Sequence, residues 1–178
     1  NMNARSSSCF GGGETAFDVA MSNEMFDIVD MLEKRGAELG PRSYEKSLLI
    51  SACYKGHKVI VEKLLLNSNV DVNARSRLCF GKTALYWAIT KGHIDTIGLL
   101  LDHGADVDST IIGGKPALVW AVSEGHTEIV CLILEKKPDV NVNARSSSCY
   151  GNGETALCCA ITKGHIATIG LLLDHGAD

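Results

Sequence analysis

Histidines and cysteines are the residues of this sequence that could hold a metal or move a proton, and they recur at regular intervals. Four of the six histidines follow a glycine: His57, His93, His126 and His165. Each belongs to a separate copy of a repeated unit. If the units stack as helical layers, about 8–10 Å separates successive histidines, whereas the ligands of one zinc ion lie about 2.0–2.3 Å from it. We therefore expect these histidines to occupy helix-to-helix turns rather than to share a metal ion.

Three cysteines, Cys9, Cys79 and Cys149, recur at intervals of 70 residues. Two helical layers would separate each from the next by about 20 Å, and the Cα atoms of a disulfide lie within about 7 Å of each other. These three cysteines therefore cannot pair. We expect them to pack at the bases of loops, with a redox-sensitive thiol as the alternative. The remaining cysteines are predicted to be small core residues of helices: Cys53, Cys131, Cys158 and Cys159.

The sequence contains no pattern typical of an active site. No Cys–His pair matches a nucleophile motif. The glycines at 11–13, 113–114, 151 and 153 lack the GxxxxGK[ST] pattern of a phosphate-binding loop, and the segment 113–116 is predicted to be a turn into a helix. We therefore predict no catalytic residue, no cofactor and no metal ion.

The regular recurrence comes from an internal repeat, which takes precedence over any local interpretation. The segment from Thr83 to His93 returns with few changes from Thr155 to His165. Related segments occur three more times, so that five units start near residues 15, 47, 83, 116 and 155. The spacings scatter around about 33 residues, the period of a unit made of one turn and two helices.

Over nearly its whole length the chain resembles the ankyrin-repeat family. The resemblance is carried by the Thr-Ala-Leu starts, the Gly-His dipeptides, the Leu-Leu-Leu segments and Gly-Ala-Asp at 104–106 and 176–178. No unit has the family's Thr-Pro-Leu-His, and the first has Glu24-Met25 in place of Gly-His. The resemblance implies an all-α solenoid of stacked helix-turn-helix units with projecting β-hairpin or loop fingers.

The chain is expected to form a single ankyrin-repeat domain over residues 1–178. Residues 1–5 resemble the end-of-repeat sequence at 141–145. Asp178 is equivalent to Asp106, which is followed by a further repeat unit. We therefore expect both ends to be cut from a longer array.

Apolar residues of the third unit recur with the spacing of two short helices. One stripe contains Ala84, Leu85, Ala88 and Ile89, and the next contains Ile94, Ile97, Leu100 and Leu101. Helices of about ten residues are unstable alone in water, so stacking must stabilise them. Thr83 is expected to cap the first helix, and Gly92 and Gly104 to adopt left-handed conformations after each helix.

Two further positions recur in the first helix of the units. Trp87 and Trp120 are equivalent, and we expect them to pack between layers, in the core. An alanine occupies one position in all five units, which indicates close helix crossing: Ala20, Ala52, Ala88, Ala121 and Ala160.

Positive charge gathers on the loops between units. Arginines stand on three long fingers, and lysines stand at the ends of first helices. In the ankyrin family the fingers and first helices form the concave, ligand-facing side, while ordinary solvated arginines are the alternative. The resemblance therefore implies a set of partner-binding residues: Arg5, Arg75, Arg77, Phe80, Lys91, Arg145, Tyr150 and Lys163.

The composition excludes several classes of protein. The 178 residues carry a net charge of −4 with 46% hydrophobic residues, which is typical of a globular domain. The longest apolar runs are far shorter than the roughly 18 residues of a membrane span, and no basic stripe indicates nucleic-acid binding. Seven cysteines without CxxC spacing indicate free thiols in a reducing compartment. We expect the cytoplasm, with the nucleus as the alternative.

These observations predict a monomeric, non-catalytic protein-protein interaction scaffold. Its concave face is expected to bind a protein partner through an acidic segment. The alternative is a regulatory or targeting segment of a larger enzyme or effector whose catalytic domain lies outside this chain. Asn73 and Asn143 stand at hairpin starts. Some ankyrin-repeat proteins are hydroxylated at that position, so the resemblance implies asparaginyl hydroxylation sites there.

Overall fold

The computed structural model describes residues 45–66, 70–75, 82–109, 114–147 and 153–178, together with positions 16, 20, 28, 31, 32 and 35. The described ranges contain eight helices and no strand. The helices are α3 (Glu45–Lys55), α4 (Lys58–Leu66), α5 (Ala84–Lys91), α6 (Ile94–Asp102), α7 (Ala117–Glu124), α8 (Thr127–Lys136), α9 (Ala156–Lys163) and α10 (Ile166–Asp174). Most of the first predicted unit, near residue 15, lies outside the described residues.

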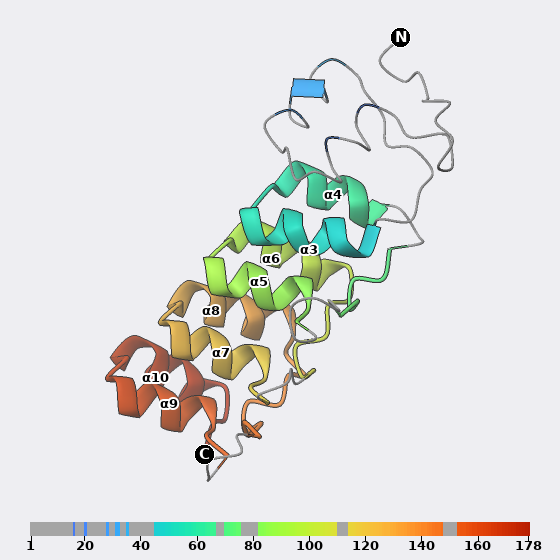
Figure 1. The fold of residues 1–178 in the computed structure, drawn as a ribbon. Helices are drawn as coiled ribbons and strands as arrows, with labels where there is room; N and C mark the ends of the chain where they lie inside the picture. Colours follow the sequence, from blue (N-terminus) through green and yellow to red (C-terminus); the bar gives the residue numbers. More distant parts are fainter. Residues whose placement is uncertain are drawn as a thin grey trace.

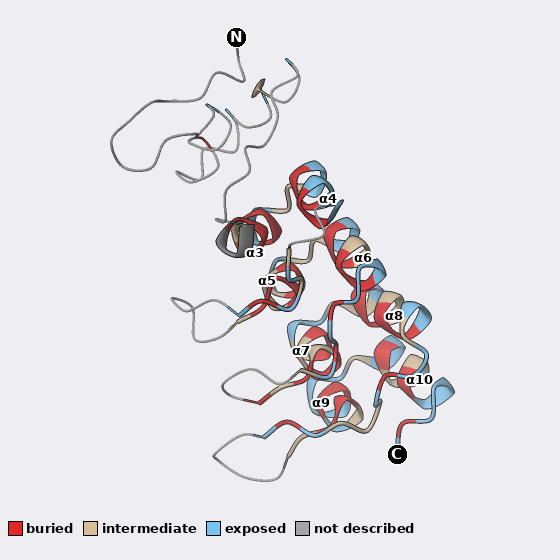
Figure 2. Cartoon of the chain, turned by 90° about the vertical axis from the view of Figure 1, so that its right-hand side faces the viewer, coloured by how far each residue is buried: buried red, intermediate tan, exposed pale blue. Residues whose placement is uncertain are grey.

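The helices form pairs that stack into two rows (Figure 1). The first helices of the pairs, α3, α5, α7 and α9, make one row, and α4, α6, α8 and α10 make the other (Figure 2). The segments that connect the pairs leave on the side of the first helices (Figure 2). The predicted all-α solenoid of helix pairs is therefore confirmed, and one of its sides is formed by first helices and connecting fingers.

The ends of the helices follow from local sequence, as predicted. The Thr83 hydroxyl accepts a hydrogen bond from the Tyr86 backbone N–H at 3.3 Å, which satisfies a group that the helix itself leaves unpaired. Gly92 ends α5 with φ 73°, and Gly104 follows α6 with φ 83°. Because a side chain strains the backbone in this region, glycine is the residue that allows each sharp turn.

The core lies between the two rows and runs through all four described pairs. The recurring alanines are buried, with exposed fractions of 4% at Ala20 and 0% at the other four. Leu100 is likewise 0% exposed. The interpretation of the alanine position as a close helix crossing is consistent with this burial. Among the described helices, none is long and apolar enough to cross a membrane.

Some predicted core residues lie at the surface. Ile94 is 40% exposed because it is the first residue of α6. Thr96, further along the same helix, is buried, with an exposed fraction of 1%. Cys158 of α9 is exposed, and Cys131 is half-buried with its thiol donating to the Glu135 carboxylate at 3.3 Å. The prediction was wrong for these three residues. It is confirmed for Cys53 and Cys159, which are buried.

Candidate partner-binding face

The structure describes half of the predicted partner-binding set. Arg75 and Arg145 lie at the bases of two fingers, and Lys91 and Lys163 are the last residues of α5 and α9. All four side chains are exposed. The other four predicted residues lie outside the described residues: Arg5, Arg77, Phe80 and Tyr150. The same is true of Cys9, Cys79 and Cys149.

Both described arginines donate a hydrogen bond to a finger, Arg75 to the next finger and Arg145 across its own finger. The Arg75 guanidinium donates to the Ser109 hydroxyl, in the next finger, at 2.7 Å. The Arg145 guanidinium donates to the Gly153 carbonyl, across its own finger, at 3.5 Å. Each side chain is therefore oriented by the protein while it remains exposed to solvent.

Adjacent fingers are also joined through their backbones. The Ser146 N–H donates to the Glu154 carbonyl at 3.0 Å, which closes the base of the last finger. The Ser147 N–H donates to the Gly114 carbonyl in the preceding finger at 2.7 Å. Gly114 has φ 69°, and a Cβ atom there would lie 2.6 Å from the Ser147 carbonyl oxygen. Glycine is thus needed for the two fingers to approach this closely.

The two predicted lysines each reach the first helix of the preceding pair. The Lys91 ammonium lies 4.6 Å from the centroid of the Tyr54 ring in α3. The Lys163 ammonium donates to the Ser123 carbonyl in α7 at 2.8 Å. These contacts place both cations on the row of first helices, on the same side as the fingers.

A cluster of aromatic residues that was not predicted from the sequence lies on this row. Tyr54 of α3 meets Trp87 of α5 edge-on at 5.1 Å between ring centroids, Trp87 meets Tyr86 at 5.4 Å, and Tyr86 meets Trp120 of α7 at 4.9 Å. We call these four residues the aromatic strip. The tryptophans do pack between layers, as predicted, but both are half-buried rather than core residues.

Three lysines accompany the aromatic strip, and we call them the lysine row: Lys82, Lys91 and Lys115. The Lys82 ammonium lies 4.4 Å from the Tyr86 centroid and 4.7 Å from the Trp87 centroid. The Lys115 ammonium lies 6.0 Å from the Trp120 centroid. The recurrence of tryptophan at equivalent positions was the signal in the sequence that could have identified this surface.

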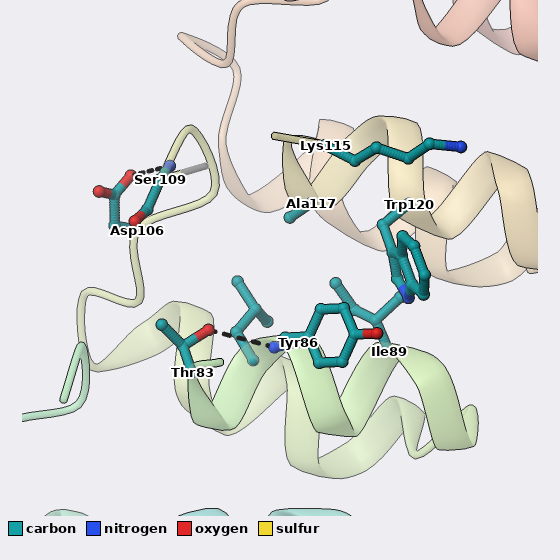
Figure 3. A pocket seen from close by; sticks show the side chains of 9 residues that line it. Thr83, Tyr86, Ile89, Asp106, Ser109, Lys115, Ala117 and Trp120 are labelled. Carbon is teal, nitrogen blue, oxygen red and sulfur yellow. Dashed lines mark hydrogen bonds between the residues drawn. The ribbon is translucent and has the colours of Figure 1, made fainter. Parts of the chain in front are cut away.

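A shallow pocket lies between α5, α7 and the finger that joins their pairs (Figure 3). Its walls include Tyr86, Ile89 and Trp120, and its cavity volume is about 10 Å³. Asp106 and Ser109 stand at the finger edge, where the Asp106 carboxylate accepts the Ser109 N–H at 3.1 Å. This space holds about one water molecule, so the pocket is a small hollow in the surface and not a site for a ligand.

The Gly-His histidines begin the second helices. The His93 Nε2 atom lies 3.2 Å from the Tyr54 carbonyl oxygen of the preceding pair. A Cβ atom on Gly56 would lie 2.6 Å from the His93 ring, which explains why glycine precedes the turn. These contacts agree with the predicted role in helix-to-helix turns. Within the described ranges, no group of three histidine, cysteine or acidic side chains is placed to hold a metal ion.

A family profile described as "Ankyrin repeats (3 copies)" matches residues 17–111, 49–146 and 111–178. The "Putative ankyrin repeat protein FPV031" of fowlpox virus (strain NVSL) is 31% identical over 88% of this chain and 46% of its own length. The "Probable E3 ubiquitin-protein ligase XBOS32" of Oryza sativa subsp. japonica is 28% identical over 96% of this chain and 32% of its own length.

The human palmitoyltransferase ZDHHC17 is 43% identical over 34% of this chain and 10% of its own length. The chain thus spans less than half the length of these relatives. The family profile, in contrast, matches residues 17–178 without a gap, and the four described helix pairs stack within that range. The chain therefore belongs to the ankyrin-repeat family, whose repeats are protein-interaction modules.

Proposed function

We propose that this chain is a scaffold without catalytic chemistry of its own that binds a protein partner on its concave side, the side of the fingers and first helices. The observation that carries the proposal is the position of Arg75 and Arg145. Both are exposed at finger bases, and each is oriented by a hydrogen bond, Arg75 to the next finger and Arg145 across its own finger. Orientation before binding lowers the entropy lost on association, and arginine is among the residues that most often dominate interface energy.

The partner we propose presents an acidic segment to this side. The chain as a whole is acidic, with a net charge of −4, yet the described finger bases and first-helix ends carry Arg75, Arg145, Lys91 and Lys163. A guanidinium pairs with a carboxylate through two parallel hydrogen bonds. Complementary charge also accelerates the encounter. The association rate is therefore expected to fall as salt concentration rises.

A second candidate is a regulatory or targeting segment of a larger enzyme. Two relatives are named as enzymes, and the chain covers only 32% of the probable ubiquitin ligase and 10% of the palmitoyltransferase. In that case the same concave side would recruit the protein on which the catalytic domain acts. A protein containing these residues and a catalytic domain would favour this candidate, and it would leave the binding surface unchanged.

Acetylation footprinting tests the concave side directly. A partner is first recovered with the tagged chain, identified by mass spectrometry and prepared in pure form. Lysines of the free chain and of the purified complex are then acetylated briefly and compared by peptide mass spectrometry. We expect protection of Lys91 and Lys163 with no change at Lys58 and Lys136, which lie on second helices. Protection confined to Lys58 and Lys136 would contradict the proposal.

A further inference from the structure

We propose that the aromatic strip and the lysine row together form the docking site for an extended segment of the partner in which acidic residues flank an apolar side chain. This inference rests on the proposed protein-binding function and names the chemistry of the partner. The apolar side chain packs against the aromatic rings, and the flanking carboxylates pair with the ammonium groups.

The aromatic strip is one continuous surface that crosses three helix pairs. Its ring centroids follow one another at 5.1, 5.4 and 4.9 Å from α3 through α5 to α7. Two layer spacings amount to about 16–20 Å, which an extended chain of about five or six residues spans. The surface is thus longer than one side chain and has the length of a short linear segment.

The strip is also fixed in position. The Trp120 indole N–H donates to the Thr90 hydroxyl at 3.0 Å, and that hydroxyl donates to the Tyr86 carbonyl at 2.9 Å. The polar atom of the indole is therefore satisfied within the protein, and the ring presents apolar surface. Tyr54, at the other end, is 39% exposed. Rigid aromatic side chains contribute contact area at a low cost in conformational entropy.

The lysine charges beside the aromatic strip determine whether it favours an anionic or a cationic ligand. The Lys82 ammonium lies 4.4 and 4.7 Å from the Tyr86 and Trp87 centroids, the Lys91 ammonium lies 4.6 Å from the Tyr54 centroid, and the Lys115 ammonium lies 6.0 Å from the Trp120 centroid. Aromatic clusters attract cations through the same ring faces, but here a cationic ligand would meet three ammonium groups. The site therefore disfavours a basic or methylated-lysine segment and favours an anionic one.

Carboxylates of the described residues leave most of this positive charge uncompensated. Within the described residues, neither Lys82 nor Lys91 pairs with a carboxylate, and Lys115 lies 3.9 Å from the Glu154 carboxylate, at the outer limit of an ion pair. A ligand carboxylate would thus gain new partners rather than displace existing ones.

The two tryptophans of the chain both belong to the aromatic strip, so intrinsic tryptophan emission reports on this site alone. The probe is a displayed library of random peptides of about twelve residues without tryptophan, selected on the full chain. We expect enrichment of peptides in which aspartate or glutamate flanks an aromatic or aliphatic residue. A synthetic copy of the most enriched peptide should shift the tryptophan emission.

Charge reversal separates this site from others. Lys82→Glu with Lys91→Glu should weaken the peptide at least about tenfold, because two favourable charge pairs become repulsive. The matched control, Lys58→Glu with Lys136→Glu on second helices, should change affinity less than about twofold. Trp87→Phe keeps an aromatic ring and should retain binding, whereas Trp87→Ala should lose it. Melting temperatures of all variants establish that each one folds.

Three results would overturn the inference: enrichment of basic peptides, failure to enrich any peptide, or acidic peptides that bind without shifting tryptophan emission or responding to the lysine reversals. If an enriched peptide instead depends on Arg75 and Arg145, docking on the strip is wrong and binding through the concave side stands. If a purified partner protects only the second helices from acetylation, the proposed function itself fails.

Discussion

The side-chain oxygen of Asn73 accepts a hydrogen bond from the backbone N–H of Asp106, in the following repeat, at 2.8 Å. The Asn73 amide also donates to the Gly104 carbonyl at 3.1 Å. Asn143 makes the same two contacts two repeats further along the chain. Its side-chain oxygen accepts from the Asp178 N–H at 3.1 Å, and its amide donates to the Gly176 carbonyl at 3.4 Å. One amide thus satisfies a donor and an acceptor of the turn that ends the next second helix, and so couples adjacent repeats.

The first prediction concerns this coupling. Asn73→Ala should lower the free energy of unfolding by about 1–3 kcal/mol, because it leaves two backbone groups without their protein partner. Asn73→Asp should retain only the contact with Asp106, since an ionised carboxylate cannot donate to the Gly104 carbonyl. Urea unfolding measures both changes. As a control, Glu62→Ala on the exposed side of α4 should stay within about 0.5 kcal/mol, and an equal loss for all three variants would refute the coupling.

The second prediction concerns modification of the same residues. Asn73 is exposed and Asn143 is half-buried, and each stands at the position that is hydroxylated in some ankyrin-repeat proteins. Incubation with an asparaginyl hydroxylase and its cosubstrates should add one oxygen atom at Asn73 and one at Asn143, located by peptide mass spectrometry. An intact mass without any added oxygen would contradict the assignment of both sites.

The third prediction compares two leucines of different burial. Leu100 is 0% exposed and Leu66 is 75% exposed. Leu100→Ala should lower the free energy of unfolding by about 2–5 kcal/mol because it opens a cavity in the core, while Leu66→Ala should change it by less than about 0.5 kcal/mol. Urea titrations followed by circular dichroism provide the comparison. Equal destabilisation would mean that the helix rows are assigned incorrectly.

The fourth prediction concerns the described thiols. Burial raises the pKa of the Cys53 thiol, and burial followed by the nearby Glu154 charge raises the pKa of Cys159. Both changes lower the thiolate fraction at neutral pH, and the thiolate is the form that reacts. Cys158 is exposed. Brief alkylation should therefore label Cys158 before Cys53 and Cys159, as read by peptide mass spectrometry, and earlier labelling of Cys53 would contradict the burial.

Cys131 adds a test of pH dependence to the same experiment. Its hydrogen bond to the Glu135 carboxylate raises the pKa of the Cys131 thiol, because the bond stabilises the protonated form. Its alkylation should rise with pH and reach half its maximum at a higher pH than in Glu135→Gln, where the charge is removed. An unchanged profile in that variant would show that the carboxylate does not act on the thiol.

Features that depend on a few neighbouring residues were predictable from the sequence. Thr83 as a cap and Gly92 as a left-handed terminus follow from the chemistry of a helix end. The alanine position followed from its recurrence at one place in every unit. These local requirements, repeated about every 33 residues, also determined the fold class.

Features that depend on how layers are offset were not predictable from the sequence alone. The periodic spacing placed Ile94 in the core stripe, but the spacing does not show where the helix begins, and Ile94, the first residue of α6, is 40% exposed. The recurrence of Trp87 and Trp120 predicted packing between layers correctly. It did not reveal the contact of Tyr54 with Trp87, because the two rings are brought together by helices 33 positions apart along the chain.

The most direct test of the central claim is the affinity of a purified partner for the variant Arg75→Glu with Arg145→Glu. The matched control is Lys58→Glu with Lys136→Glu, which makes the same change in charge on second helices and breaks exposed ion pairs worth at most about 1 kcal/mol each. If the partner binds the concave side, the arginine variant keeps its helical signal and weakens binding by more than about tenfold, while the control stays near the unaltered chain. Unchanged affinity of the arginine variant, with loss in the control, would place the binding site on the second helices and contradict the account.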